Sequence, residues 1–76
     1  MKRILARETP SHVNKEIVVK GFVHVRRDHG KLIFFDLRDG SGILQVVVVP
    51  SVSEEAHKVA LELRPEDVVE VHGLVK

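Results

Sequence analysis

Hydrophobic and polar residues alternate along most of this chain, which is the pattern of β-strands that bury one face. The alternation predicts a first strand from Glu16 to about Arg27, a second over residues 32–38 and a third from Ile43 to Val49. Beyond Pro50 the apolar residues recur at helical spacing instead: Val52, Ala56, Val59, Ala60 and Leu63. A fourth strand over Val68–Val75 follows, so the predicted order is three strands, a helix and a strand.

The second and third strands form a hairpin if residues 39–42 make the loop, and Asp36 then lies opposite Gln45. One face of this pair is wholly apolar. The other face carries four residues of mixed character: Phe34, Asp36, Arg38 and Gln45. Phe34 and Gln45 lie diagonally across the ladder, with Cβ atoms about 7 Å apart. A ring and an amide at that separation could hold one flat heteroaromatic group, stacked on the first and hydrogen-bonded to the second.

The predicted helix has clear ends. Ser51 or Ser53 caps it, and Glu54 and Glu55 lie in its first turn, where the helix dipole favours acids. Arg64–Pro65 ends it, because the residue before a proline is pushed out of the helical region. We interpret the helix as a structural plug for a barrel.

Gly21 interrupts the first strand and predicts a sharp bend or a bulge, by which one strand serves two sides of a closed barrel. Without a shift, Val25 belongs to the same apolar set as Ile17, Val19 and Val23. Beyond a bulge the alternation can shift by one residue. The sequence therefore leaves open whether Arg26 or Arg27 shares the outer face with His24.

This order of elements predicts an all-β fold with one helix, a small barrel like the oligonucleotide-binding (OB) fold, apparently without its fifth strand. We expect residues 16–76 to form the OB domain, truncated at its C-terminal end, and residues 1–15 to form an extended N-terminal strap. Three explanations for the missing strand are open: a truncated chain, a strand from a partner, or compensation by the strap. An open edge also predicts a homo-oligomer or a strand-swapped assembly.

Length and composition narrow the chemistry. The chain has 76 residues, one domain at most, and no cysteine, which excludes disulfides and thiolate zinc sites. The histidines show no paired metal-site spacing, and we interpret His24, His57 and His72 as ordinary surface residues. No nucleophile–base set or phosphate loop is present, so we expect no catalytic site, metal or cofactor. Without an apolar run of membrane-spanning length, the expectation is a cytoplasmic protein with no membrane partner.

The net charge is only +1, but the charges are unevenly distributed. Residues 20–38 carry a net +3, from Lys20, Arg26, Arg27, Lys31 and Arg38 against Asp28 and Asp36. Residues 53–76 carry a net −3. The positive charge lies on or beside the face that bears Phe34 and Gln45. Nucleic-acid binding and mere solubility are both open explanations for the charges alone.

The densest part of the sequence resembles a known family. Gly21–His24, Arg26–Asp39 and Gly42–Val47 are similar to the N-terminal anticodon-binding domain of class II aspartyl-tRNA synthetases, whose close relatives are the asparaginyl and lysyl enzymes. The similarity extends from about residue 16 to the end of the chain. It implies an OB fold that binds the anticodon loop of a tRNA.

The resemblance also implies roles for single residues. Phe34 matches the phenylalanine that stacks on the central anticodon uridine, and Gln45 the glutamine that hydrogen-bonds its edge. Arg27 and Asp28 match residues that contact the anticodon region. A histidine at the position of His29 resembles the non-discriminating type, which accepts both the aspartate and the asparagine tRNA. Two further basic residues complete the predicted nucleic-acid-binding set: Arg26 and Arg38. Arg38 has the alternative of pairing with Asp36 on the sheet surface.

The chain also departs from the family. Phe22 stands where tryptophan is common, and Val25 where an additional arginine is found. The class II catalytic domain is absent, so we predict that this chain alone is no enzyme and contributes tRNA binding and specificity. The alternative is a truncated or engineered OB scaffold that self-assembles or binds protein and keeps a vestigial RNA face.

Overall fold

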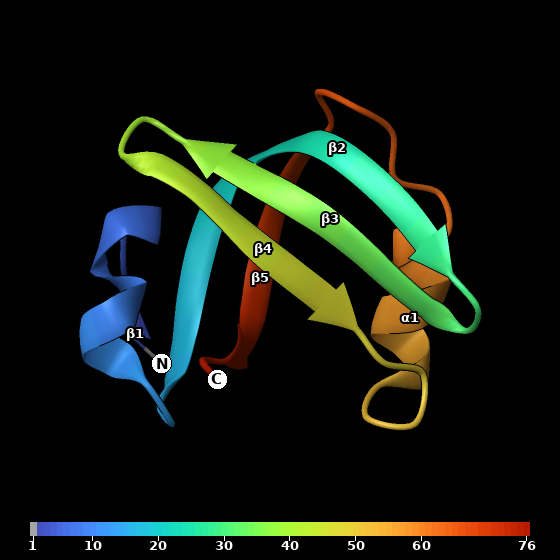
Figure 1. The fold of residues 1–76 in the computed structure, drawn as a ribbon, viewed down its shortest axis with the longest axis horizontal. Coiled ribbons are helices and arrows are strands. Elements are labelled where there is room, and N and C mark those ends of the chain that lie inside the picture. Colours follow the sequence, from blue (N-terminus) through green and yellow to red (C-terminus); the bar gives the residue numbers. More distant parts are fainter. Residues whose placement is uncertain (1) are drawn as a thin grey trace.

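A computed structural model describes residues 2–76. Five strands, one 3-10 helix (η1) and one α-helix follow one another along the chain: β1 (Lys2–Arg3), η1 (Ala6–His12), β2 (Glu16–His29), β3 (Leu32–Asp39), β4 (Gly42–Val48), α1 (Glu54–Ala60) and β5 (Val68–Leu74). Figure 1 shows them as a curled sheet with η1 at one end and α1 at the other.

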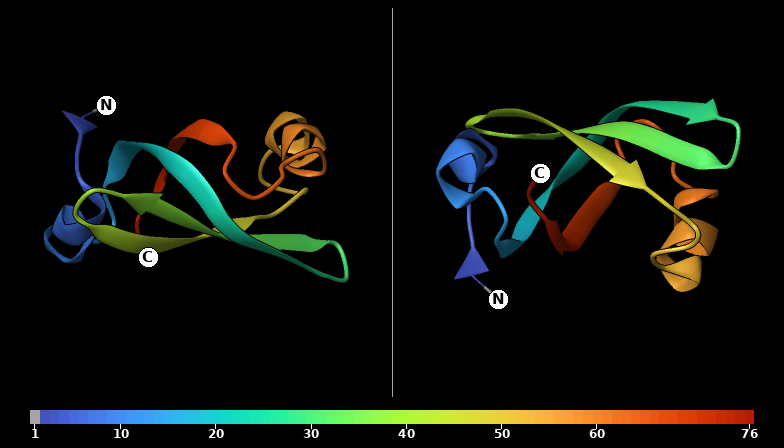
Figure 2. Two further views of the ribbon diagram at one scale, coloured as in Figure 1. Left: turned by 90° about the horizontal axis from the view of Figure 1, so that it is seen from above. Right: turned by 60° about the horizontal axis from the view of Figure 1, so that its bottom comes forward.

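The long strand β2 organises the sheet. Its first half pairs antiparallel with β5 from Glu16 to Phe22, and its second half pairs antiparallel with β3 from Phe22 to His29. β4 pairs antiparallel with β3, and the short β1 runs parallel to the start of β2. The four antiparallel strands and the helix confirm the predicted fold class. Within residues 2–76, β4 and β5 do not pair, so the sheet is an open half-barrel (Figure 2).

Gly21 lies where β2 passes from one half of the sheet to the other. A Cβ atom there would lie 2.3 Å from the Arg38 carbonyl oxygen, so only glycine permits this close approach of the two backbones. The register shift follows slightly later, between Val23 and Val25. The shift turns Val25 outward, where it is 39% exposed.

The core lies inside the curl of the half-barrel. It consists of buried side chains from β2 and β3 and one from the N-terminal segment: Ile4, Ile17, Val19, Val23, Phe35 and Leu37. Partly buried residues of β4 and β5, among them Val46, Val69 and Val71, pack against it. The alternation predicted these inward faces because each strand keeps its period of two on either side of the bulge.

The N-terminal residues do not form the expected extended strap, because Ala6–His12 form η1. The N–H groups at the start of a helix need acceptors, and the β3–β4 turn supplies them. The Ala6 N–H donates to Asp39 Oδ2 at 2.7 Å, and the Arg7 N–H donates to Ser41 Oγ at 3.1 Å. η1 therefore packs at the β3–β4 turn, and the edge between β4 and β5 stays open.

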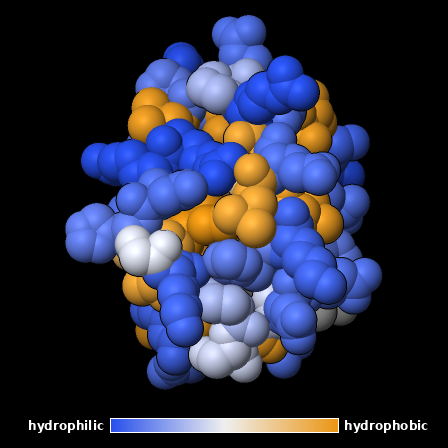
Figure 3. Space-filling model, turned by 90° about the vertical axis from the view of Figure 1, so that its right-hand side faces the viewer, coloured by the Kyte–Doolittle hydropathy of each residue, from blue (hydrophilic) through white to orange (hydrophobic). Residues whose placement is uncertain are grey.

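Ser53 caps α1, since its side chain accepts a hydrogen bond from the Ala56 N–H at 3.2 Å. The helix ends at Ala60, earlier than expected. Its apolar residues are only partly covered: Ala60 is buried, whereas Val59 is 60% exposed. They border a groove of about 540 Å³ between α1, β4 and β5. Figure 3 views this end of the molecule and shows apolar side chains within a hydrophilic surface.

Candidate nucleic-acid interface

The outer face of β2, β3 and β4 carries the candidate site. The predicted hairpin register holds: Asp36 lies opposite Gln45, and Phe34 lies opposite Val47. On the other side of β3, Phe34 lies opposite Arg27. Phe34 and Gln45 therefore share one face of the sheet, and the bulge in β2 brings Arg27 to the same face.

Four side chains on this face surround a shallow pocket of about 270 Å³: Arg27, His29, Phe34 and Gln45. Phe34 is half-buried and Gln45 is exposed. The His29 and Phe34 rings meet edge to face, with centroids 6.3 Å apart and an interplanar angle of 85°. The pocket thus combines an aromatic floor, a second ring at its side, one amide and one guanidinium.

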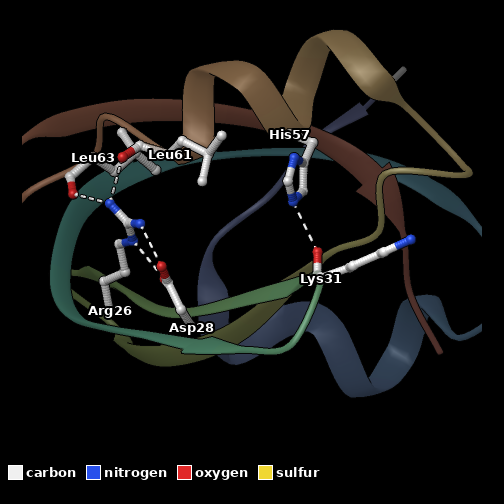
Figure 4. Close-up of polar contacts among 6 residues, drawn as sticks. All are labelled: Arg26, Asp28, Lys31, His57, Leu61 and Leu63. Atoms are coloured by element: carbon white, nitrogen blue, oxygen red, sulfur yellow. Dashed lines mark hydrogen bonds and ion pairs between the residues drawn. The ribbon is translucent and has the colours of Figure 1, made fainter.

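Arg26 lies on the opposite face, toward α1 (Figure 4). Its Nη1 donates to the carbonyl oxygens of Leu61 at 2.7 Å and Leu63 at 3.0 Å, just beyond the end of the helix. Its Nε and Nη2 donate to the two carboxylate oxygens of Asp28, both at 2.9 Å. The structure therefore separates Arg26 and Asp28 from the pocket that the other four residues line.

The surroundings of Asp28 favour the ionised form of its carboxyl group. The hydrogen bonds from Arg26 have the largest effect and lower the pKa of Asp28; desolvation opposes them, and the positive charges of Arg26 and His57 add to the lowering. The Arg26 side chain is 19% exposed and that of Asp28 is 51% exposed. Asp28 is therefore an ionised partner of Arg26 at the rim of the sheet.

His57 makes a second contact between α1 and the hairpin. Its Nε2 donates to the Lys31 carbonyl oxygen at 2.8 Å, across the β2–β3 turn (Figure 4). Local sequence patterns carry no signal for this contact, because its partners lie far apart in the chain. The same is true of the bonds from Arg26 to the backbone beyond α1.

Arg38 lies on the outer face but does not line the pocket. It pairs with Phe22 on β2 and with Ile43 on β4, and it is exposed. No ion pair joins Arg38 to Asp36 in the structure of residues 2–76. Arg38 is therefore an exposed cation on the same face as the pocket but outside it.

The part of the chain that the structure describes holds no group of three histidine or acidic side chains placed to bind a metal ion. None of its helices is long and apolar enough to cross a membrane.

A family model described as an OB-fold nucleic acid binding domain matches residues 17–76. The aspartate–tRNA ligase of Staphylococcus saprophyticus is 56% identical over 68 residues, which cover 90% of this chain and 12% of that protein. The corresponding ligase of Macrococcus caseolyticus is 51% identical over 67 residues, covering 88% of this chain and 11% of that protein. The chain thus spans about 12% of the length of such relatives.

Solved structures show the same likeness. Asparaginyl-tRNA synthetase from Pyrococcus horikoshii, in complex with asparaginyl-adenylate, superimposes with a TM-score of 0.86 at 33% identity, over 97% of this chain and 18% of that one. An OBody bound to hen egg-white lysozyme superimposes with a TM-score of 0.83 at 28% identity, over 97% of this chain and 73% of the OBody.

Proposed function

The chain belongs to the family of OB-fold nucleic acid binding domains, and from this premise we propose that it is the tRNA anticodon-binding module of an aspartate–tRNA ligase. The observation that carries the proposal is the pocket in which Arg27, His29, Phe34 and Gln45 meet on one face of the sheet. The module contributes binding and specificity. The chemistry of the ligase belongs to other parts of the parent protein, which we place in the cytoplasm.

A splayed base of the anticodon loop stacks on Phe34, and the Gln45 amide hydrogen-bonds the edge of that base. Proteins read RNA sequence mostly in single-stranded loops, because the base edges are accessible there. Stacking on an aromatic side chain contributes about 1–3 kcal/mol per base. The half-buried position of Phe34 supports this role, since it fixes the ring while the pocket leaves room above it.

Arg27 and Arg38 attract the phosphates of the loop. Both lie on the outer face, within the segment 20–38 that carries a net +3. Phosphate contacts release counterions, so binding weakens as salt increases. Arg27 also borders the base pocket, where a guanidinium can reach a base edge.

His29 sets the tolerance of the pocket for different tRNAs, and we place the parent ligase in the non-discriminating type. The support is the resemblance at this position and the position of the His29 ring beside Phe34. RNA hairpins with the aspartate and the asparagine anticodon should then bind within about threefold of each other, a difference below 1 kcal/mol. A tenfold preference for the aspartate hairpin would contradict this assignment.

The experiment that tests the proposal is a fluorescence titration of the 76-residue chain with an anticodon stem-loop of the aspartate tRNA. Gln45→Ala should weaken binding, because the edge of the base loses its partner. Ile43→Ala is the matched control: Ile43 lies on the same face of the same strand and is 55% exposed, but it does not line the pocket. Equal affinities of the parent for this loop and for a loop of unrelated sequence would refute anticodon reading.

The alternative is an OB scaffold that binds protein or assembles with itself through the open edge between β4 and β5. Identity to the OBody is 28%, against 56% and 51% to the two ligases, so the comparisons do not favour it. Sedimentation separates the two proposals. A monomer that binds the stem-loop supports the anticodon module, whereas a stable oligomer that ignores RNA supports the scaffold.

A further inference from the structure

We propose that Arg26 and His57 are positioning residues: they clamp the tip of the β2–β3 hairpin to α1 and so hold Arg27 and His29 in the pocket. This inference rests on the proposed function, because it concerns the same pocket. It assigns α1, on the far side of the sheet, a part in RNA binding that involves no contact with RNA.

The tip of the β2–β3 hairpin lacks a third strand in the part of the chain that the structure describes. The last pair between β3 and β4 is Ile33 with Val48, whereas β2 and β3 continue to the pair His29 with Leu32. Beyond Ile33 the hairpin continues for one pair and its turn, and no third strand from residues 2–76 supports that part. One wall of the pocket, His29, lies on that part.

α1 and the residues just after it contact the β2–β3 hairpin at two points, one in its turn and one where β2 is still part of three paired strands (Figure 4). His57 donates to the carbonyl oxygen of Lys31 in the turn. Arg26 donates to the carbonyl oxygens of Leu61 and Leu63, which follow the helix. Leu61 is the C-cap of α1, and carbonyl groups at a helix C-terminus lack intrahelical donors and carry partial negative charge, so a guanidinium is a suitable partner there.

The Arg26 guanidinium has almost no hydrogen-bonding capacity left for RNA. Four of its five N–H groups are engaged by Asp28, Leu61 and Leu63. The two-pronged bond to Asp28 fixes the orientation of the residues on both sides of Arg27. Because side chains alternate along a strand, Arg27 must then point to the opposite face, into the pocket.

The test is a mutant cycle measured by stem-loop affinity. Arg26→Gln should lower the affinity of the parent about fivefold or more, because neighbouring groups that act through one another are coupled. In a background that already carries Arg27→Gln and His29→Ala, Arg26→Gln should change the affinity by less than about twofold. An undiminished loss in that background would show that Arg26 itself contacts RNA, and no loss in the parent would show that it positions nothing.

Three further variants keep the test decisive. Arg26→Lys retains the charge but not the planar fork, so it should also lose affinity, by less than Arg26→Gln. His57→Ala should weaken binding without changing any charge on the outer face. Arg64→Gln is the control: it removes one exposed cation outside the pocket and the clamp, and it should bind like the parent.

Amide exchange in the free protein separates this inference from the proposed function. If the parent chain does not bind the stem-loop, the proposed function fails, but the clamp can still be judged. Arg26→Gln and His57→Ala should accelerate exchange of the amides of residues 28–32 while those of the β2–β5 ladder keep their rates. Unchanged exchange at the tip in both variants would overturn the clamp.

Discussion

Asp39 joins the N-terminal segment to the β3–β4 turn, and its replacement by asparagine should detach one from the other. Asp39 Oδ1 accepts hydrogen bonds from the Ser41 N–H, the Ser41 hydroxyl and the Gly42 N–H, at 2.7, 2.6 and 3.2 Å. Oδ2 accepts the Ala6 N–H at 2.7 Å. An asparagine can keep the turn bonds through its carbonyl oxygen, but it then directs an NH2 group at the Ala6 N–H.

The cost follows from these bonds. A hydrogen bond to a charged acceptor contributes about 1.5–3 kcal/mol, and leaving a partly buried donor without a partner costs about 1–3 kcal/mol. We expect Asp39→Asn to lower the free energy of unfolding by about 1–3 kcal/mol. For a domain of this size each kcal/mol lowers Tm by about 4–8 °C, so the fall should be roughly 5–20 °C.

The pH dependence of the unfolding free energy tests the role of Asp39 independently. Partial burial would raise the pKa of Asp39, but the hydrogen bonds from Ser41, Ala6 and Gly42 outweigh it, so the pKa is lowered. A carboxyl group with a lowered folded-state pKa stabilises the fold above its unfolded pKa of about 3.9 and loses this contribution as pH falls through the folded value. The gap between parent and Asp39→Asn should therefore be full at pH 7 and shrink below about pH 4.

Urea unfolding at pH 7 and at pH 3 measures both effects, and amide exchange at Ala6 reports the detachment directly. Asp36→Asn is the control, since its carboxylate accepts no hydrogen bond in the structure of residues 2–76. An unfolding free energy for Asp39→Asn within about 0.5 kcal/mol of the parent, the range of neutral surface changes, would refute this account of the N-terminal segment.

Three further stability predictions follow from particular contacts. Gly21→Ala should cost about 3 kcal/mol or more, because its Cβ would lie 2.3 Å from the Arg38 carbonyl oxygen; Gly40→Ala, with nothing within 4 Å, is the control in the same thermal melt. Ser53→Ala should cost about 1 kcal/mol in urea unfolding through loss of the helix cap, and an unchanged midpoint would contradict the cap. Val59→Glu should change stability by less than about 0.5 kcal/mol, since Val59 is 60% exposed, and a large loss would show that the groove is closed.

The sequence predicted the four strands from β2 to β5 and the shared face of Phe34 and Gln45, because alternation and hairpin register are local properties. It could not predict which arginine faces the pocket, because the shift between Val23 and Val25 depends on how β2 bends over the core. The same shift decides that Val25 lies outside the core.

Contacts between distant parts of the chain were beyond the reach of local patterns. The N-terminal residues form η1 because Asp39, more than 30 positions away, provides an acceptor for the Ala6 N–H. The bonds from Arg26 to Leu61 and from His57 to Lys31 also join residues that are far apart in the sequence. Each needs a partner that only the folded chain brings close.

In the proposed function, Phe34 forms the floor of a site for one nucleobase. The most direct measurement is a cycle that combines Phe34→Ala with a stem-loop in which the central anticodon base is removed. The parent should bind the loop without the base roughly 5- to 150-fold more weakly than the intact loop, the equivalent of 1–3 kcal/mol of stacking. For the loop without the base, Phe34→Ala should lower the affinity only slightly further. If Phe34→Ala binds both loops as tightly as the parent does, the ring does not carry the base, and the proposed site is contradicted.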